Sequence, residues 1–395
     1  MWLLVALLAA AVAVAIVTRR SALPYTVGLV LFGLTLSLIG PAVAFPVSPK
    51  LLLAIVLPGL VFEAAFRTDL AILRRSAGWI FLLAIPGVVV VATIVAAILS
   101  ATTTLTFTES FLVGAMVAAT DPAAILGTFR QIRVPIRLET IVEMESLVND
   151  GTGIVLFAVA LEMLEGGGSI GGSVVVFAVS LVGSAILGAL LGAVAARIVR
   201  GIDEHLTQLT ITVVLAYGTY LAADAVGLSG VITTLVAAGA FGTIARGDLT
   251  SQTRDTIDVV WEFAAFLLTA GVFLLVGLAI APSTLALAAE PIVWGVLAIL
   301  IARAIVVYGL LGIPATLFAR RGRQDLAIPR PWLHVLFWAG LRGAVSVALA
   351  LSIPSDVPNR ELIQGVTFGI VLFTLIVQGS TAGLVVRRTG ASTTS

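Results

Sequence analysis

Several ionisable side chains interrupt long apolar stretches of this sequence. A charge in the middle of such a stretch costs roughly 2.5–3.5 kcal/mol to insert into a bilayer, so a charge that is kept there is expected to have a function. Carboxylates in such places could bind a small cation or a proton, because both ligands use the same oxygens. The interrupting residues are Glu63, Asp121, Glu143, Glu145, Asp150, Arg303 and Arg342.

The stretch Glu145–Gly151 groups several of these candidate ligands. Ser146 and Asp150 lie four residues apart and therefore share one face of a helix, and Glu145 and Asn149 share the adjoining face. The first face carries hard oxygen donors, and the second presents another carboxylate beside it. This spacing predicts a small-cation site on the Asp150 face.

A second group of oxygens surrounds Asp121. Pro122 lacks an amide donor and clashes with the carbonyl four residues earlier, so the helix should break at Ala119–Pro122. Broken helices at membrane depth commonly supply oxygens that bind ions. The plainer alternative is a proline kink in which Asp121 caps the second half-helix, and both interpretations can hold together.

The two groups together suffice for most of a cation's coordination shell. Sodium is a hard cation and prefers oxygen ligands. We expect Na⁺ to bind at Asp121, Ser146 and Asp150, with the Thr120 carbonyl or hydroxyl beside them. A carboxylate in a partly dehydrated site also binds protons readily, so cation and proton can compete for it. Such competition becomes antiport if the site is exposed alternately to the two sides.

A second interruption is predicted around Arg342. Gly340 and Gly343 flank this arginine where a continuous apolar helix would otherwise be expected. Arg342 is expected to donate to carbonyls of the broken helices, since a fixed positive charge repels a cation.

The composition requires that lipid surrounds these elements. Hydrophobic residues make up 60% of the 395 positions, charged residues 11%, and mean hydropathy is +1.17. A water-soluble globular domain is thereby excluded. There is no cysteine and the net charge is +1, which argues against disulfides, thiolate metal sites and nucleic-acid binding. The sequence predicts an all-α, polytopic integral membrane protein.

Apolar runs of about 20 residues, the length needed to span a bilayer, occur thirteen times. They fall near residues 2–18, 22–45, 51–66, 79–100, 109–129, 139–163, 170–197, 206–223, 229–246, 258–281, 290–318, 331–353 and 361–386. An N-terminus outside places 18 basic residues in inner loops and only Lys50 and Arg360 in outer loops. The C-terminus is then cytoplasmic.

Thirteen spans divide into six, one linker and six, which gives two inverted six-helix repeats of the kind found in secondary transporters. The fifth and twelfth spans are then counterparts, and each carries one of the predicted breaks. We expect these two discontinuous helices to cross. The whole chain is expected to form a single membrane unit without a soluble domain.

Four stretches together resemble the NhaP/NHE-type sodium/proton antiporters, along nearly the whole chain. They are LPGLVFE at 57–63, ATDP at 119–122, ESLVNDG at 145–151 and GLRGAVS at 340–346. Two positions depart from the family pattern. Gly59 stands where Pro is usual, and Thr269 stands near a position that is usually Asn, which affects the expected ion selectivity.

The resemblance implies roles for individual residues. Asp150 would be the principal carrier of cation and proton, Glu63 would lie near the cytoplasmic approach, and Asn149 is associated with electroneutral one-for-one exchange. The resemblance also pairs Glu145 with Arg303 and implies a homodimer. It further implies an ion-transport core of residues 79–165 and 284–395 and a scaffold of residues 1–78 and 166–283. No cofactor is expected beyond the transported Na⁺ and H⁺.

The favoured function is exchange of Na⁺ for H⁺, with Li⁺ as a further candidate substrate, which would serve pH homeostasis. No enzymatic motif is present. Potassium/proton exchange is an alternative, since the same carboxylates could support it. A cation channel is another alternative, although clustering of acidic residues at one depth favours alternating access. A prokaryotic plasma membrane is the expected location.

Overall fold

The computed structural model describes residues 2–19, 23–39, 48–166, 170–245, 247, 249–322 and 327–391. In these ranges the chain is helical, with short connections, and contains no strand. This agrees with the predicted all-α class. Residues 40–45 of the predicted second span lie outside the described residues.

The helices occur along the chain in the following order. The first half contains α1 (Trp2–Arg19), α2 (Tyr25–Ile39), α3 (Pro49–Arg67), α4 (Leu70–Ala84), α5 (Pro86–Thr102), α6 (Phe107–Ala118), α7 (Ala123–Ile132), α8 (Ile136–Leu164) and α9 (Ile170–Val199). The second half contains α10 (His205–Ala225), α11 (Gly230–Ala245), α12 (Ser251–Ala279), α13 (Pro282–Leu287), α14 (Ala289–Ala304), the π-helix η1 (Ile305–Leu311), α15 (Gly312–Arg320), α16 (Arg330–Trp338), α17 (Ala344–Leu351), α18 (Arg360–Phe373), the π-helix η2 (Thr374–Gly379) and α19 (Ser380–Thr389).

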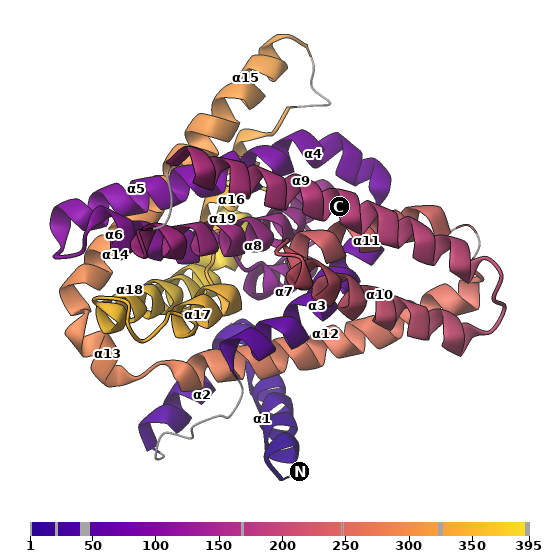
Figure 1. Ribbon diagram of the computed structural model, residues 1–395, viewed down its shortest axis with the longest axis horizontal. Helices are drawn as coiled ribbons and strands as arrows, with labels where there is room; N and C mark the ends of the chain where they lie inside the picture. Colours follow the sequence, from indigo (N-terminus) through magenta and orange to yellow (C-terminus); the bar gives the residue numbers. More distant parts are fainter. Residues whose placement is uncertain are drawn as a thin grey trace.

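Nine helical stretches among the described residues are long and apolar enough to cross a membrane. Three shorter apolar helices, Leu7–Thr18, Tyr25–Leu38 and Gly230–Ala245, add to them. The count of thirteen crossings and the inverted repeats stay predictions, since length and composition alone do not settle them. In Figure 1, α12 runs along one edge of the helix bundle, α1 projects beyond that edge, and α15 projects from the opposite side.

Both predicted interruptions are present. The fifth span is divided into α6 and α7 by the non-helical residues 119–122, and the twelfth into α16 and α17 by residues 339–343. Pro122 stands immediately before α7, where its missing amide proton is not needed by the helix. The half-helices are short, with 12 and 10 residues in the first pair and 9 and 8 in the second, so packing against their neighbours must hold them.

One boundary differs from the sequence prediction. Residues 70–78 were expected to form a connection before the fourth span, but α4 begins already at Leu70. Asp69 explains this start, because its carboxylate accepts hydrogen bonds from the amides of Ala71 (2.7 Å) and Ile72 (3.4 Å). The helix therefore carries Arg74 and Arg75 on its exposed side.

The buried apolar residues form two clusters. The larger includes α5, α6, α8, α14, α17 and α18 and surrounds the two interruptions. The smaller joins α3, α9, α10, α11 and α12, with Phe62, Phe241 and Trp261 among its members. All helices of the smaller cluster belong to the segments that the sequence assigns to the scaffold. The domain boundaries themselves stay a prediction.

The helices α2 and α12 cross at two glycines, Gly33 and Gly277. A Cβ added at Gly277 would overlap the carbonyl of Val30 and would lie 2.8 Å from the amide nitrogen of Leu34. Both obstacles belong to the backbone, which cannot move aside as a side chain would. The close approach therefore requires glycine at this position.

We predict that Gly277→Val destabilises the protein by roughly 1–3 kcal/mol, because overpacking a tight contact forces helices apart. The measurement is thermal unfolding of the detergent-purified protein. Gly271→Val is the matched control on the same helix, since a Cβ there meets nothing within 4 Å. Equal melting temperatures for the two variants would contradict the close-crossing interpretation.

Candidate functional site

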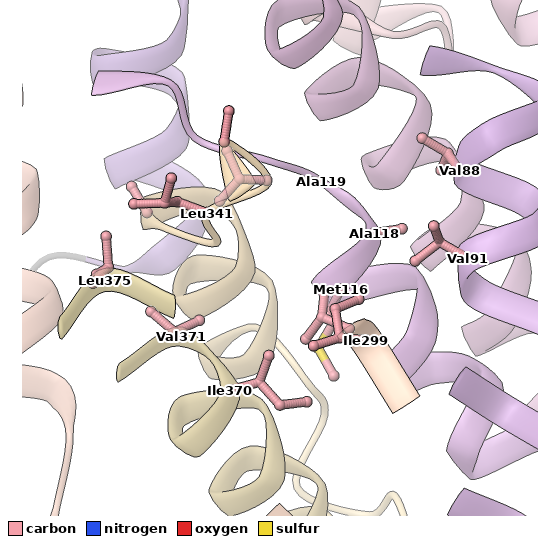
Figure 2. Packing of buried hydrophobic residues seen from close by; sticks show 14 of the residues in the cluster. Val88, Val91, Met116, Ala118, Ala119, Ile299, Leu341, Ile370, Val371 and Leu375 are labelled. Carbon is pink, nitrogen blue, oxygen red and sulfur yellow. The ribbon is translucent and has the colours of Figure 1, made fainter. Parts of the chain in front are cut away.

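The two interruptions touch through their backbones. The amide of Asp121 donates to the carbonyl of Leu341 over 2.7 Å, so the extended segment of one break lies against that of the other. Apolar side chains pack around this contact, including Met116 and Ala118 from α6, Leu341, and Val371 from α18 (Figure 2). The contact satisfies backbone groups that a continuous helix would have paired internally.

The Asp121 carboxylate lies where two half-helices begin. Its Oδ1 accepts from the amide of Ala123 (3.0 Å), the first residue of α7. Its Oδ2 accepts from the amide of Ala344 (3.4 Å), the first residue of α17. Helix N-termini carry partial positive charge, so one carboxylate stabilises both. The space is tight, because a Cβ added at Gly343 would overlap this carboxylate.

Arg342 compensates the opposite helix end. Its Nη1 donates to the carbonyls of Ala118 (2.9 Å) and Ala119 (3.1 Å), where α6 ends. A positive group at a helix C-terminus is favourable, and these two carbonyls have no helical partner. The side chain is fully buried. Sequence reasoning expected Arg342 to donate to carbonyls of the broken helices, and these two carbonyls lie at the first break.

Three polar residues join the first break to α8. The Thr120 amide donates to Asn149 Oδ1 (3.0 Å), and Asn149 Nδ2 donates back to the Thr120 hydroxyl (2.7 Å). The hydroxyls of Thr120 and Ser146 are 2.9 Å apart, and Ser146 donates to the carbonyl of Val142 (3.0 Å). A hydroxyl has one proton, so Thr120 must donate to Ser146. Each hydroxyl oxygen keeps a lone pair for a further ligand.

Asp150 stands apart from this network. Its side chain is 9% exposed, and no hydrogen bond to it occurs within the described part of the chain. It interacts electrostatically with Asp121, so the two negative charges repel each other. The structure thus brings Asp121, Thr120, Ser146, Asn149 and Asp150 together at the break. A pair of repelling carboxylates with free hydroxyl lone pairs nearby is suited to bind a cation or a proton.

Glu145 and Arg303 form a buried ion pair between α8 and α14. The guanidinium binds both carboxylate oxygens, and its Nη2 also donates to the carbonyl of Leu336 (2.8 Å) at the end of α16. The exposed fractions of the two side chains are 2% and 6%. The pair therefore neutralises two charges and holds α8, α14 and α16 together.

Glu63 forms an ion pair on its own helix, and its expected place near the cytoplasmic approach stays a prediction. Its carboxylate accepts from Arg67 Nη1 (2.7 Å), one turn later on α3, and Arg67 also lies 3.6 Å from Glu262 on α12. The further electrostatic neighbours of Glu63 include Arg130 on α7 and Glu262, and neither Asp121 nor Asp150 is among them. The structure does not bring Glu63 into the Asp150 group.

Sequence reasoning missed three contributors. Thr374 Oγ1 accepts from the amide of Arg342 (3.0 Å), and Ser346 Oγ donates to the carbonyl of Met116 (2.8 Å). Glu109 is buried, caps α6 together with Thr106, and accepts from Asn359 (2.8 Å). A hydroxyl within the apolar run 368–377 was the available signal for Thr374.

The buried ion pair leads to a stability prediction. Arg303→Met alone should destabilise the protein by about 3–5 kcal/mol, because it leaves the Glu145 charge without compensation. The double variant Glu145→Met/Arg303→Met should recover much of that loss, since no charge remains buried. Unfolding measurements on both single variants and the double variant form a thermodynamic cycle. Additive losses would contradict a direct coupling between the two residues.

The sequence and the fold of this chain both match known proteins. The family model for the sodium/hydrogen exchanger, transmembrane, matches residues 4–388. The Na⁺/H⁺ antiporter ApNhaP of Aphanothece halophytica is 37% identical over 376 residues, which are 93% of this chain and 70% of the relative. The Na⁺/H⁺ antiporter NhaP of Pseudomonas aeruginosa is 34% identical over 344 residues, 84% of this chain and 79% of the relative.

A solved structure shares the fold. The sodium proton antiporter MjNhaP1 from Methanocaldococcus jannaschii superposes with a TM-score of 0.76, and the match covers 98% of this chain and 97% of that one. Its sequence is 20% identical, so this likeness speaks for the fold alone. With the family model matching almost the whole chain, this protein belongs to the sodium/hydrogen exchanger family, whose members are transporters and not enzymes.

Proposed function

We propose that this protein exchanges Na⁺ for H⁺ across the membrane with one-for-one stoichiometry, and that Asp150 carries both ions. The antiporters to which it is similar support the exchanged pair. The observation that carries the assignment to Asp150 is its lack of a hydrogen bond among the described residues, beside an Asp121 carboxylate that both half-helix N-termini hold.

Asp121 and Asp150 differ in the hydrogen bonds that each would lose on binding a proton or a cation. Asp121 already accepts two backbone amides, so protonating it would weaken the caps of α7 and α17. Asp150 loses no hydrogen bond when it takes up a proton or a cation. Either ligand also relieves its repulsion from Asp121. Asp150 is therefore the better carrier, and Asp121, Ser146 and Thr120 complete the cation's ligands.

Asn149 supports the one-for-one stoichiometry. Its amide oxygen and nitrogen are both used by Thr120, and an amide takes up no proton near neutral pH. A carboxylate at this position would add a second proton-binding group to the moving site. With the amide, one carboxylate carries either one Na⁺ or one H⁺, and the loaded site has the same charge in both directions.

Movement between core and scaffold would expose Asp150 alternately. Gly151, the residue after Asp150 on α8, lies against the start of α11, since a Cβ added at Gly151 would be 2.5 Å from Ile232 Cγ1 and 3.2 Å from Ser229 Oγ, just before that helix. The interface between the two groups of helices therefore passes beside the carrier. A loaded Asp150 has reduced charge and crosses this apolar boundary at lower cost than an empty one.

The proposal also covers the orientation, the assembly and the substrate range of the protein. We place the N-terminus outside and the C-terminus in the cytoplasm of a prokaryotic cell, following the basic residues, and we expect a homodimer from the family resemblance. Li⁺ is expected as an alternative substrate, because it shares the preference of Na⁺ for oxygen ligands.

The test is antiport in proteoliposomes with an imposed pH gradient, followed by an internal pH dye. Asp150→Asn should reduce Na⁺-dependent dissipation to background, because the amide binds neither ion well. In the unchanged protein the rate should not respond to a clamped membrane potential. On the acid side, the KM for Na⁺ should rise about tenfold per pH unit, as expected for one proton competing with one cation.

Glu162→Gln is the matched control, since it removes an exposed carboxylate from the same helix as Asp150. It should retain the parental rate. Antiport that survives Asp150→Asn would remove Asp150 from the carrier role. Dissipation by K⁺ in place of Na⁺ would favour potassium/proton exchange, and conduction without proton coupling would favour a channel.

Thr374 gives a prediction for the second break. Thr374→Val should lower the transport rate, because the buried amide of Arg342 loses its acceptor, at a cost of roughly 1–3 kcal/mol. Thr374→Ser should retain transport, since it keeps the hydroxyl. Thr367→Val is the control on α18, where the lost hydroxyl bonds only the carbonyl of Ile363 (2.9 Å) in the same helix. The measurement is the antiport rate per folded protein, and equal rates for the two valine variants would contradict the role of Thr374.

A further inference from the structure

A cavity whose lining includes none of the residues of the Asp150 group lies between α4 and α11. Its volume is about 610 Å³, and its walls include Leu73 and Phe81 from α4, Met144 from α8, and Val236 and Ile244 from α11. The helices α4 and α11 each pack against α8, and residues of all three helices line the cavity. This size lies within the range of small-molecule sites.

The lining suits hydrocarbon and not an ion or water. Its polar side chains are Arg74 and Thr243, and the Thr243 hydroxyl donates to the carbonyl of Gly239 (2.7 Å) in its own helix. Water in a cavity needs two or more polar partners, which these walls do not offer. An empty hollow of this size would forfeit dispersion contacts along all its walls, so in a bilayer an acyl chain is the natural occupant.

Arg74 gives the cavity a positive charge, which favours a lipid with an anionic headgroup. Arg74 is exposed, lines the cavity, and makes no ion pair within the described part of the chain. It lies near Arg67 and Arg75, on the side that the basic residues predict to be cytoplasmic. A long arginine stem can lie along apolar walls while its guanidinium reaches the phosphate level. Basic residues at this level attract anionic lipids.

We propose that the groove between α4 and α11 binds one acyl chain of an anionic phospholipid, with the lipid phosphate at Arg74. The groove is bounded by α8 from the predicted core and by α11 from the predicted scaffold, and α4 spans the boundary predicted after residue 78. A lipid bound there stabilises the arrangement of core and scaffold in which the groove is present. This consequence for transport rests on the proposed movement of core against scaffold, whereas lipid binding itself does not.

Two variants distinguish binding of the acyl chain from binding of the lipid headgroup. Gly239 lines the groove, and a Cβ added to it meets nothing within 4 Å, so Gly239→Leu fills the space without disturbing the fold. Gly218→Leu is the matched control, because Gly218 is an exposed glycine of α10 where an added Cβ is equally free. Arg74→Gln removes the phosphate partner, and the neighbouring exposed Arg75→Gln is its control.

The experiment is native mass spectrometry of the purified full chain, titrated with dioleoyl phosphatidylglycerol or with dioleoyl phosphatidylcholine. The unchanged protein should retain the anionic lipid more tightly, by about fivefold. Gly239→Leu should lose binding of both lipids, Arg74→Gln should abolish only the preference, and both controls should behave as the parent does.

Equal retention of the two lipids by the unchanged protein would overturn the headgroup assignment. Retention of lipid by Gly239→Leu at the level of Gly218→Leu would overturn the groove as the site. Binding is measured without transport, so a failure of the lipid proposal is distinguishable from a failure of the exchange proposal.

Discussion

The hydrogen bond from the Asp121 amide to the Leu341 carbonyl is the contact on which the rest of the site depends. Two helices that stop inside a membrane leave amides and carbonyls without partners, and hydrocarbon offers no replacement. Here one hydrogen bond between the two interruptions satisfies an amide of the first and a carbonyl of the second. Side chains from the following spans supply more, with Asn149 bonding the Thr120 amide and Thr374 bonding the Arg342 amide. The breaks are therefore stable only as a pair.

Once the backbone is satisfied, the charges of the site can be assigned by what they compensate. Asp121 balances the N-termini of α7 and α17, and Arg342 balances the C-terminus of α6. Glu145 and Arg303 cancel each other. Asp150 is left as the carboxylate of the group without such a partner among the described residues. A buried charge of this kind is costly unless it binds something, so the fixed charges around it direct a mobile cation or proton to one residue.

The sequence predicted the features that have local causes. Pro122 and the pair Gly340 and Gly343 indicated both breaks, because proline and glycine act on the backbone at their own positions. The pairing of Glu63 could not be predicted in this way, since either Arg67 on its own helix or the distant carboxylates could have been its neighbours. The capping of the Arg342 amide by Thr374 was also hidden, because it depends on how the last long span packs against the second break.

The hydrogen bonds of the hydroxyls explain how a cation could enter without dismantling the site. Ser146 donates to Val142 and accepts from Thr120, while Thr120 accepts from Asn149, so both oxygens are oriented and each keeps one lone pair. A dehydrated cation beside Asp150 would find these lone pairs already directed by the protein, and no internal hydrogen bond has to break. A proton needs only the carboxylate. The two ligands thus compete for one residue and differ in how much of the surrounding network they use, which gives the site a structural basis for telling them apart.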